Sequence, residues 1–228
     1  MERKLAEEKI NASLKEKELL LREIHHRVKN NIQVISSLLK LQYDYIKDKE
    51  AQEMLIESQN RIEAMALIHE KLYQTENLSR IDFKRYIETL TDTLFDFYGV
   101  CAERILLKID VDKVLFGIDA AIPCGLIVNE LVSNSLKHAF PEGRCGEIKI
   151  ALLPLDENVF ELTVSDNGMG LPRGLDFRNT ESLGLQLVNI LTEQLHGEIE
   201  IDRASGTEFK ITFKRKKHVK RKNSDSRR

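Results

Sequence analysis

Apolar residues recur every three or four positions between residues 5 and 73, and neither proline nor glycine interrupts this part of the chain. Such spacing is typical of amphipathic helices. The polar segment 47–52 (KDKEAQ) separates two periodic stretches, which predicts the bend of a helical hairpin. The apolar stripes are too wide for one partner helix. Two copies of the hairpin would complete a four-helix bundle, so we predict a homodimer.

The pattern changes after residue 80, where short runs of alternating apolar and polar residues separate helical stretches. A helix is predicted from Asp82 to Gly99, because Asp often caps the start of a helix and Gly often ends one. Several strands follow one another through short turns, so the expected fold is an α+β sandwich with helices on one face of a mixed sheet. Further helices are predicted at 120–138 and 184–195, and strands at 105–111, 146–153, 159–166, 197–203 and 207–214.

Charge is distributed unevenly along the chain. The net charge is −2, but residues 214–228 hold nine Lys or Arg and one Asp, which leaves −10 for residues 1–213. An acidic body does not form a nucleic-acid surface, so we expect no nucleic-acid partner. The basic tail lacks apolar residues apart from Val219 and is expected to be disordered, as a solvated charged end.

The chain shows no apolar run of about eighteen residues, and its N-terminus lacks the apolar core of a signal peptide. We therefore expect no membrane span and a cytoplasmic location. The three cysteines are too scattered for a disulfide framework or a metal site, so we expect reduced, partly buried thiols.

Two adjacent histidines interrupt the apolar pattern of the first predicted helix. With Ile24 at zero on a helical wheel, the apolar face centres near 20° and His26 lies at roughly 200°, opposite it. A solvent-facing imidazole can attack an electrophile at neutral pH. Glu23 and Asn30 share its face, so Glu23 could accept a hydrogen bond from one ring nitrogen and Asn30 could orient a water. The alternative is a plain polar helix face.

A second group of polar residues lies on one stripe of the predicted helix 120–138. Glu130, Asn134, Lys137 and His138 follow at i, i+4, i+7 and i+8. They present an acid, a neutral oxygen ligand and two donors, which suit Mg²⁺ and phosphates because Mg²⁺ prefers oxygen ligands.

Glycines follow the strand that ends at Asp166. Gly168 and Gly170 allow a sharp turn and a close approach to a flat ligand, and Asp166 can accept a hydrogen bond from an adenine amino group. Gly184 stands at a helix start, where free N–H groups favour phosphate, and Thr207 opens the last strand. Each of these features is also common as an ordinary turn or helix cap.

Together the motifs resemble a known family. EIHHRVKNNIQVISSLLKLQ, followed by RIEAMALIHEKLY at 61–73, resembles the dimerisation and phosphoacceptor hairpin of the second histidine-kinase subclass, related to HWE kinases. Arg27 stands where the commoner subclass has an acid. The order of the Asn-containing helix, DxGxG, xLGL and GT resembles the Bergerat-type ATPase fold of histidine kinases, gyrase-like ATPases, Hsp90 and MutL.

The resemblance implies a role for each site residue. Asn134 would ligate Mg²⁺, Glu130 would position the metal or a water, and Asp166 would read adenine. Ser182 stands where many relatives have the first glycine of GLGL. From the polar helix stripe and the resemblance together, the residues expected to contact the nucleotide or flank its lid are Asn134, Lys137, His138, Asp166, Gly168, Gly170, Ser182, Leu183, Gly184, Leu185 and Thr207.

The function implied by the resemblance is that of an ATP-dependent protein-histidine autokinase of a two-component system. It would phosphorylate His26 and pass the phosphoryl group to an aspartate in the receiver domain of a response regulator. The expected domains are a helical input linker at 1–17, receiving a signal from an upstream sensory domain outside this chain, a phosphotransfer hairpin at 18–77, an ATP-binding domain at 78–213 and the basic tail. Two alternatives remain open: a serine kinase of the anti-sigma-factor type with Glu130 as base, and a non-catalytic nucleotide-binding scaffold.

Overall fold

The computed structural model describes residues 2–73, 81–101, 103–172, 174–180 and 182–215. The chain divides into two compact units, and each contains two separate stretches of sequence. The first unit comprises Met1–Leu94 and Leu115–Glu130, and the second comprises Phe95–Val114 and Leu131–Arg228. Two of the three dividing points fall inside helices and none lies near residues 17, 77 or 213, so the predicted domain boundaries at these positions stay predictions.

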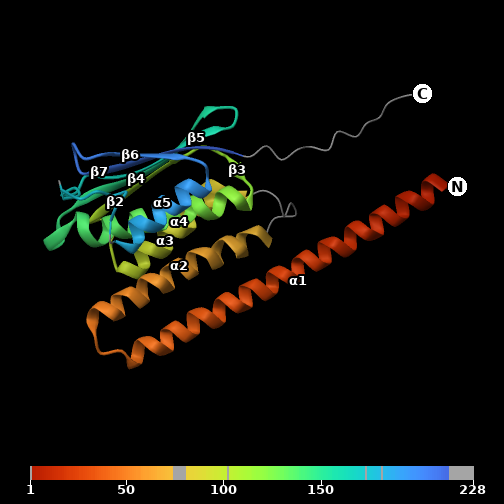
Figure 1. The fold of residues 1–228 in the computed structure, drawn as a ribbon, viewed down its shortest axis with the longest axis horizontal. Helices are drawn as coiled ribbons and strands as arrows, with labels where there is room; N and C mark the ends of the chain where they lie inside the picture. The colour runs from red at the N-terminus through yellow and green to blue at the C-terminus, as the bar shows by residue number, and fades with distance from the viewer. Residues whose placement is uncertain (1, 74–80, 102, 173, 181, 216–228) are drawn as a thin grey trace. The chain divides into compact units, whose positions relative to one another are not determined.

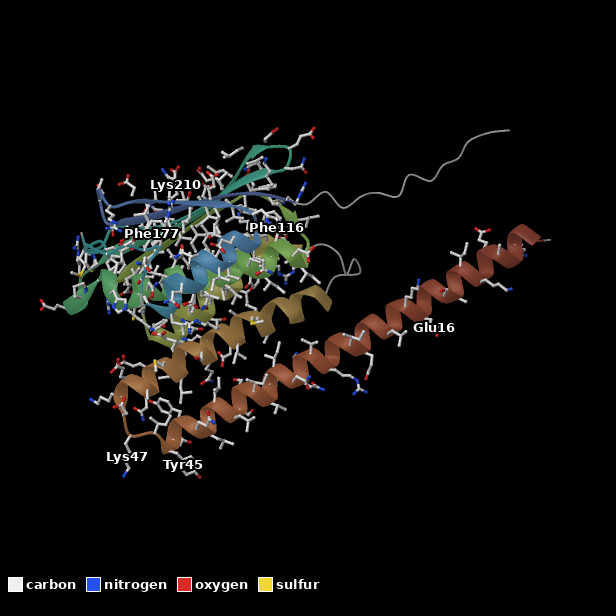
Figure 2. All side chains as sticks on the ribbon, viewed as in Figure 1. Glu16, Tyr45, Lys47, Phe116, Phe177 and Lys210 are labelled. Atoms are coloured by element: carbon white, nitrogen blue, oxygen red, sulfur yellow. The ribbon has the colours of Figure 1, made fainter. Side chains whose placement is uncertain are left out.

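The first unit begins with the predicted helical hairpin. Helix α1 spans Glu2–Tyr45 and helix α2 spans Lys49–Tyr73, antiparallel beside its second half (Figure 1). Asp48 caps the start of α2, because its carboxylate accepts the N–H of Ala51 at 2.9 Å. Tyr45 lies beside the bend and is 85% exposed (Figure 2).

The apolar stripe of α1 is only half covered within one chain. Ile24 is 54% exposed and Leu38 55% exposed, although both belong to the face that the sequence pattern assigned to a core. The apolar pattern of α1 therefore marks a face of this helix that α2 alone does not cover.

The first unit also holds a two-stranded sheet and parts of two further helices. Strand β1 (Ile81–Asp82) pairs with β3 (Leu115–Phe116), α3 spans Phe83–Tyr98, and α4 spans Ile118–Asn134. Asp82 caps α3 as predicted, through the N–H of Arg85 at 3.2 Å.

A glycine on α4 makes room for an aromatic ring on α3. A Cβ on Gly125 would lie 2.2 Å from the Tyr86 hydroxyl oxygen, so no larger residue fits without a shift. Tyr86 and Cys124 are fully buried here. Burial raises the pKa of both groups well above their ordinary values, and the nearby Cys124 raises the pKa of Tyr86 further.

The second unit is built on a five-stranded mixed sheet with the order β2-β4-β5-β7-β6. β2 runs parallel to β4 and the other pairs are antiparallel, which confirms the predicted α+β character. Helix α5 (Leu183–Gln194) lies along one face of this sheet (Figure 1). The strands are β2 Ile105–Val111, β4 Gly146–Asp156, β5 Val159–Asp166, β6 Glu198–Asp202 and β7 Thr207–Lys214.

Strand β7 shows why these sequences form a sheet with one buried face. Thr207, Phe209, Ile211 and Phe213 are buried, whereas the residues between them are partly exposed. This two-residue period places every apolar side chain on the same side of the strand.

Three features differ from the sequence expectations. The predicted helix 120–138 is divided: α4 ends at Asn134, and a π-helical turn follows at Ser135–Ala139. The sheet of β1 and β3 was not predicted. Two of the three cysteines are exposed and only Cys124 is buried. No described helix is both long and apolar enough to cross a membrane. The tail beyond residue 215 lies outside the described residues.

Candidate functional site

A cavity of about 730 Å³ lies in the second unit, between the sheet, the π-helical turn and the start of α5. This volume is in the range usual for small-molecule sites. Its lining is mostly apolar, with a few polar groups. The predicted site residues that line it are Asn134, His138, Asp166, Gly170, Ser182, Leu185 and Thr207.

Asp166 lies at the end of β5 and is 8% exposed. Its Oδ2 accepts the hydroxyl hydrogen of Ser135 at 2.8 Å, and its Oδ1 accepts the N–H of Gly168 at 2.9 Å. Thr207 stands directly opposite Asp166 in the register of β5 and β7. The carboxylate is therefore held by two hydrogen bonds and keeps acceptor capacity for a further donor.

Two glycines allow the backbone around Asp166 to pack closely. A Cβ on Gly168 would lie 2.4 Å from the carbonyl oxygen of Ala139, and one on Gly206 would lie 2.0 Å from the carbonyl oxygen of Asp166. Gly206 also has a φ of +105°, which disfavours other residues. Met169 donates its N–H to the Ala139 carbonyl at 3.0 Å, so this loop is tied to the π-helical turn.

The π-helical turn presents the residues that follow α4. Asn134 and His138 line the cavity, as does Ser135. Lys137 is not among the lining residues; its ammonium lies 5.9 Å from the centre of the Tyr98 ring, within the range of a cation–π interaction.

The start of α5 forms another side of the cavity. Ser182 is the N-cap residue of α5 and makes no side-chain capping bond, while its carbonyl accepts the N–H of Gln186 at 3.0 Å. Leu185 is buried against the cavity and Gly184 is also buried. Leu183 points away, with 58% of its side chain exposed.

Glu130 is held by a residue that the sequence did not single out. In the first unit its carboxylate accepts two hydrogen bonds from Arg61 of α2, at 2.7 and 2.8 Å. Glu130 is 4% exposed and does not line the described cavity.

On α1, the candidate helper Glu23 already has a partner. Its carboxylate accepts a hydrogen bond from Arg27 at 2.9 Å in an exposed pair one turn apart. Asn30 is exposed. The backbone of His26 belongs to α1, whereas its side chain lies outside the described part of the structure.

Comparison with known families matches two long segments of the chain. Residues 23–98 match a model described as histidine kinase. Residues 120–217 match a model described as histidine kinase-, DNA gyrase B-, and HSP90-like ATPase. The chain belongs to the histidine kinase family. This membership confirms the resemblance seen in the sequence.

Known histidine kinases match most of this chain. It is 32% identical over 185 residues to the sensor histidine kinase PdtaS of Mycobacterium tuberculosis, which covers 80% of this chain and 36% of that protein. It is 26% identical over 189 residues to blue-light-activated histidine kinase 2 of Erythrobacter litoralis, covering 80% of this chain and 53% of that one. The chain therefore spans between a third and about half of these relatives.

Solved structures of histidine kinases share the fold. The Erythrobacter litoralis blue-light activated histidine kinase gives a TM-score of 0.63 at 25% identity, over 85% of this chain and 62% of that chain. The histidine kinase domain of the same protein gives 0.64 at 21% identity, over 79% of this chain and 95% of that chain. These likenesses confirm the predicted combination of a helical hairpin and a mixed sheet.

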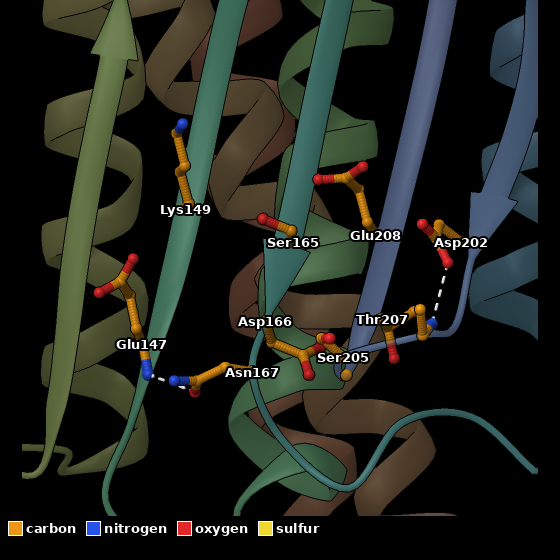
Figure 3. A pocket seen from close by; sticks show the side chains of 11 residues that line it. Glu147, Lys149, Ser165, Asp166, Asn167, Asp202, Ser205, Thr207 and Glu208 are labelled. Carbon is orange, nitrogen blue, oxygen red and sulfur yellow. Dashed lines mark hydrogen bonds between the residues drawn. The ribbon is translucent and has the colours of Figure 1, made fainter.

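A second hollow lies at the ends of β4, β5 and β7, on the strand face that carries charged residues (Figure 3). It measures about 220 Å³ and is lined by polar side chains such as Lys149, Ser165 and Glu208. Asn167 accepts the N–H of Glu147 at 2.8 Å at its edge. Higher on β7, Glu208 hydrogen-bonds Lys210 and raises the pKa of that ammonium.

Two functional candidates were missed at the level of sequence. Ser135 directly follows Asn134, and a hydroxyl next to the predicted metal ligand was a signal that could have been used. Arg61 offered no such signal, because its partner lies 69 positions away.

Proposed function

We propose that this chain is an ATP-dependent protein-histidine kinase that phosphorylates His26 and then passes the phosphoryl group to an aspartate in the receiver domain of a response regulator. The observation that carries the proposal is the arrangement of Asp166, Ser135 and Thr207 in the cavity, because one buried carboxylate with fixed acceptor geometry suits the amino group of adenine. The same chain carries a long helix with His26.

The residues around the cavity suit a nucleotide with its metal. The described residues contain no group of three acidic, histidine or cysteine side chains that could hold a cation alone. Mg²⁺ often takes only one or two protein ligands and the rest from phosphates and water. The side-chain oxygen of Asn134 would hold it. Bound there, Mg²⁺ would offset negative charge on the transferred phosphoryl group.

In the proposed reaction a ring nitrogen of His26 attacks the γ-phosphorus, and the bond from that phosphorus to the bridging oxygen of ADP breaks. The proton on the other ring nitrogen is held by a base. Glu23 can take this role when it releases Arg27 and accepts a hydrogen bond from His26 instead. The Glu23–Arg27 pair is exposed, and such pairs contribute little stability, so the change of partner costs little. Asn30, on the same helix, would orient a water in the later hydrolysis of the phosphohistidine.

We further propose that the kinase is a homodimer and that α1 receives the signal of a sensory domain. The half-exposed apolar stripe of α1, including Ile24 and Leu38, supports pairing with a second hairpin. α1 has 44 residues and α2 has 25, so the first part of α1 extends beyond the described end of α2, as a linker to a preceding domain would.

The test is incubation of the chain with ATP labelled on the γ-phosphate, followed by treatment with acid and with base. Phosphohistidine is lost in acid and survives base. We expect acid-labile label on the chain and on an added receiver domain, and its absence in His26→Gln at unchanged ATP affinity. The variant His25→Gln is the matched control and should keep the label. Acid-stable label would support the serine kinase alternative. Binding of nucleotide without any label would support the non-catalytic scaffold.

A further inference from the structure

Arg61 and Glu130 form a two-pronged ion pair between α2 and α4. Arg61 Nε donates to Glu130 Oε1 at 2.8 Å, and Arg61 Nη2 donates to Oε2 at 2.7 Å. The Arg61 side chain is 13% exposed and the Glu130 side chain 5%. This parallel geometry is the strongest arrangement that a guanidinium and a carboxylate can form.

The surroundings of the pair are polar and incompletely satisfied. Glu57 approaches Arg61 at 3.5 Å, and the side-chain amide of Asn129 donates to Glu130 at 3.2 Å. Among the described residues, Asn60 Nδ2 and Asn129 Oδ1 are buried without a hydrogen-bond partner. Such atoms disfavour the packed state, and a buried ion pair adds little stability compared with an apolar contact. The two-pronged geometry makes the contact specific, while the desolvation of both charges and the unsatisfied amide atoms offset much of its energy.

The pair determines what Glu130 can do. Both of its carboxylate oxygens accept hydrogen bonds from Arg61, and one also accepts a bond from Asn129. A carboxylate held in this way is not available to a water or a cation. Asn134, one turn further along α4, lines the nucleotide cavity, whereas Glu130 does not.

We propose that the Arg61–Glu130 pair is an autoinhibitory contact, in which the hairpin holds the carboxylate away from its work in phosphoryl transfer. Opening of the pair releases Glu130 to the nucleotide site and starts autophosphorylation. This inference rests on the proposed kinase activity and adds to it a residue, Arg61, that controls the site from the helix paired with the phosphoacceptor helix.

The experiment compares Arg61→Gln and Glu130→Gln in the full chain, with two readouts. The first is the initial rate of acid-labile labelling from ATP, and the second is hydrogen exchange in peptides covering 57–64 and 125–133. Both variants break the pair, so both should exchange faster at these peptides. Arg61→Gln should label faster, by about tenfold, which is usual for coupled equilibria, while Glu130→Gln should label more slowly than the unmodified chain.

The control is Lys108→Gln, which removes an exposed ion pair to Glu147 on the sheet. It should leave both readouts unchanged. If Arg61→Gln does not fold, Arg61→Lys takes its place in the test, because lysine keeps the positive charge and loses the two-pronged geometry. It should give an intermediate rise in rate.

Slower or unchanged labelling in a folded Arg61 variant with faster exchange would overturn the autoinhibitory role. Unchanged exchange in both variants would show that the pair is not formed in solution. Absence of label in the unmodified chain would instead refute the kinase proposal and this inference with it.

Discussion

Replacement of Asp166 by asparagine separates the role of this residue in the fold from its proposed role in adenine recognition. In the folded chain, Asp166 accepts hydrogen bonds from Gly168 and Ser135. Asparagine keeps an oxygen for Gly168, and its amide can donate to the Ser135 oxygen, because a hydroxyl group rotates and also accepts. The fold therefore exchanges charge-assisted bonds for neutral ones and loses about 1 kcal/mol.

Nucleotide binding is expected to lose more than the fold. The carboxylate would accept a hydrogen bond from the adenine amino group. The NH2 group of asparagine would instead face that amino group, so that two hydrogen-bond donors meet. Such an unsatisfied contact inside a cavity costs about 2 to 3 kcal/mol, or roughly 30- to 150-fold in affinity.

The assay is calorimetric titration with a non-hydrolysable ATP analogue, together with thermal unfolding. Asp202→Asn is the matched control, because Asp202 also ends a strand and accepts the N–H two residues on, at 2.9 Å, but is exposed. It should bind the analogue as the unmodified chain does. An Asp166→Asn variant that binds within twofold of the unmodified chain would remove adenine recognition from Asp166.

Four further predictions concern stability and reactivity. Tyr86→Phe should leave the free energy of unfolding unchanged or raise it by up to about 1 kcal/mol in urea titrations, because the buried hydroxyl has no partner among the described residues. A thiol reagent should react quickly with two cysteines and with Cys124 only on unfolding, since burial raises the pKa of this thiol. The folded chain keeps that proton and the unfolded chain releases it, so stability should also fall as pH rises past about 8.5, as pH-dependent denaturation would reveal. Gly206→Ala should cost about 2 to 4 kcal/mol, because the new Cβ meets the Asp166 carbonyl at a positive φ, and Gly174→Ala, with open space around it, should be neutral in the same unfolding assay.

Local patterns predicted the regular elements well. The strands 105–111, 159–166 and 207–214 have the bounds expected from alternation, and α3 begins and ends beside Asp82 and Gly99. In these segments buried and exposed residues follow one constant spacing from end to end. A short stretch of sequence is therefore enough to predict the element and its bounds.

The differences arise where structure depends on distant residues or on irregular geometry. A helical period does not encode the π-helical turn after Asn134, in which backbone hydrogen bonds span five residues instead of four. The two-residue strands β1 and β3 are defined by a pairing between Ile81 and Phe116 that no local pattern contains. Glu130 was predicted on the polar stripe with Asn134, and the pattern could not reveal that Arg61 engages it.

The register of β5 and β7 has a thermodynamic consequence for the proposed nucleotide. Asp166 and Thr207 are 41 positions apart, yet the backbone ladder sets them directly opposite each other before any ligand binds. Binding then requires no loss of conformational entropy to bring the two groups together, so most of their interaction energy would appear as affinity. Recognition of the base would accordingly be pre-organised by the sheet and independent of loop closure.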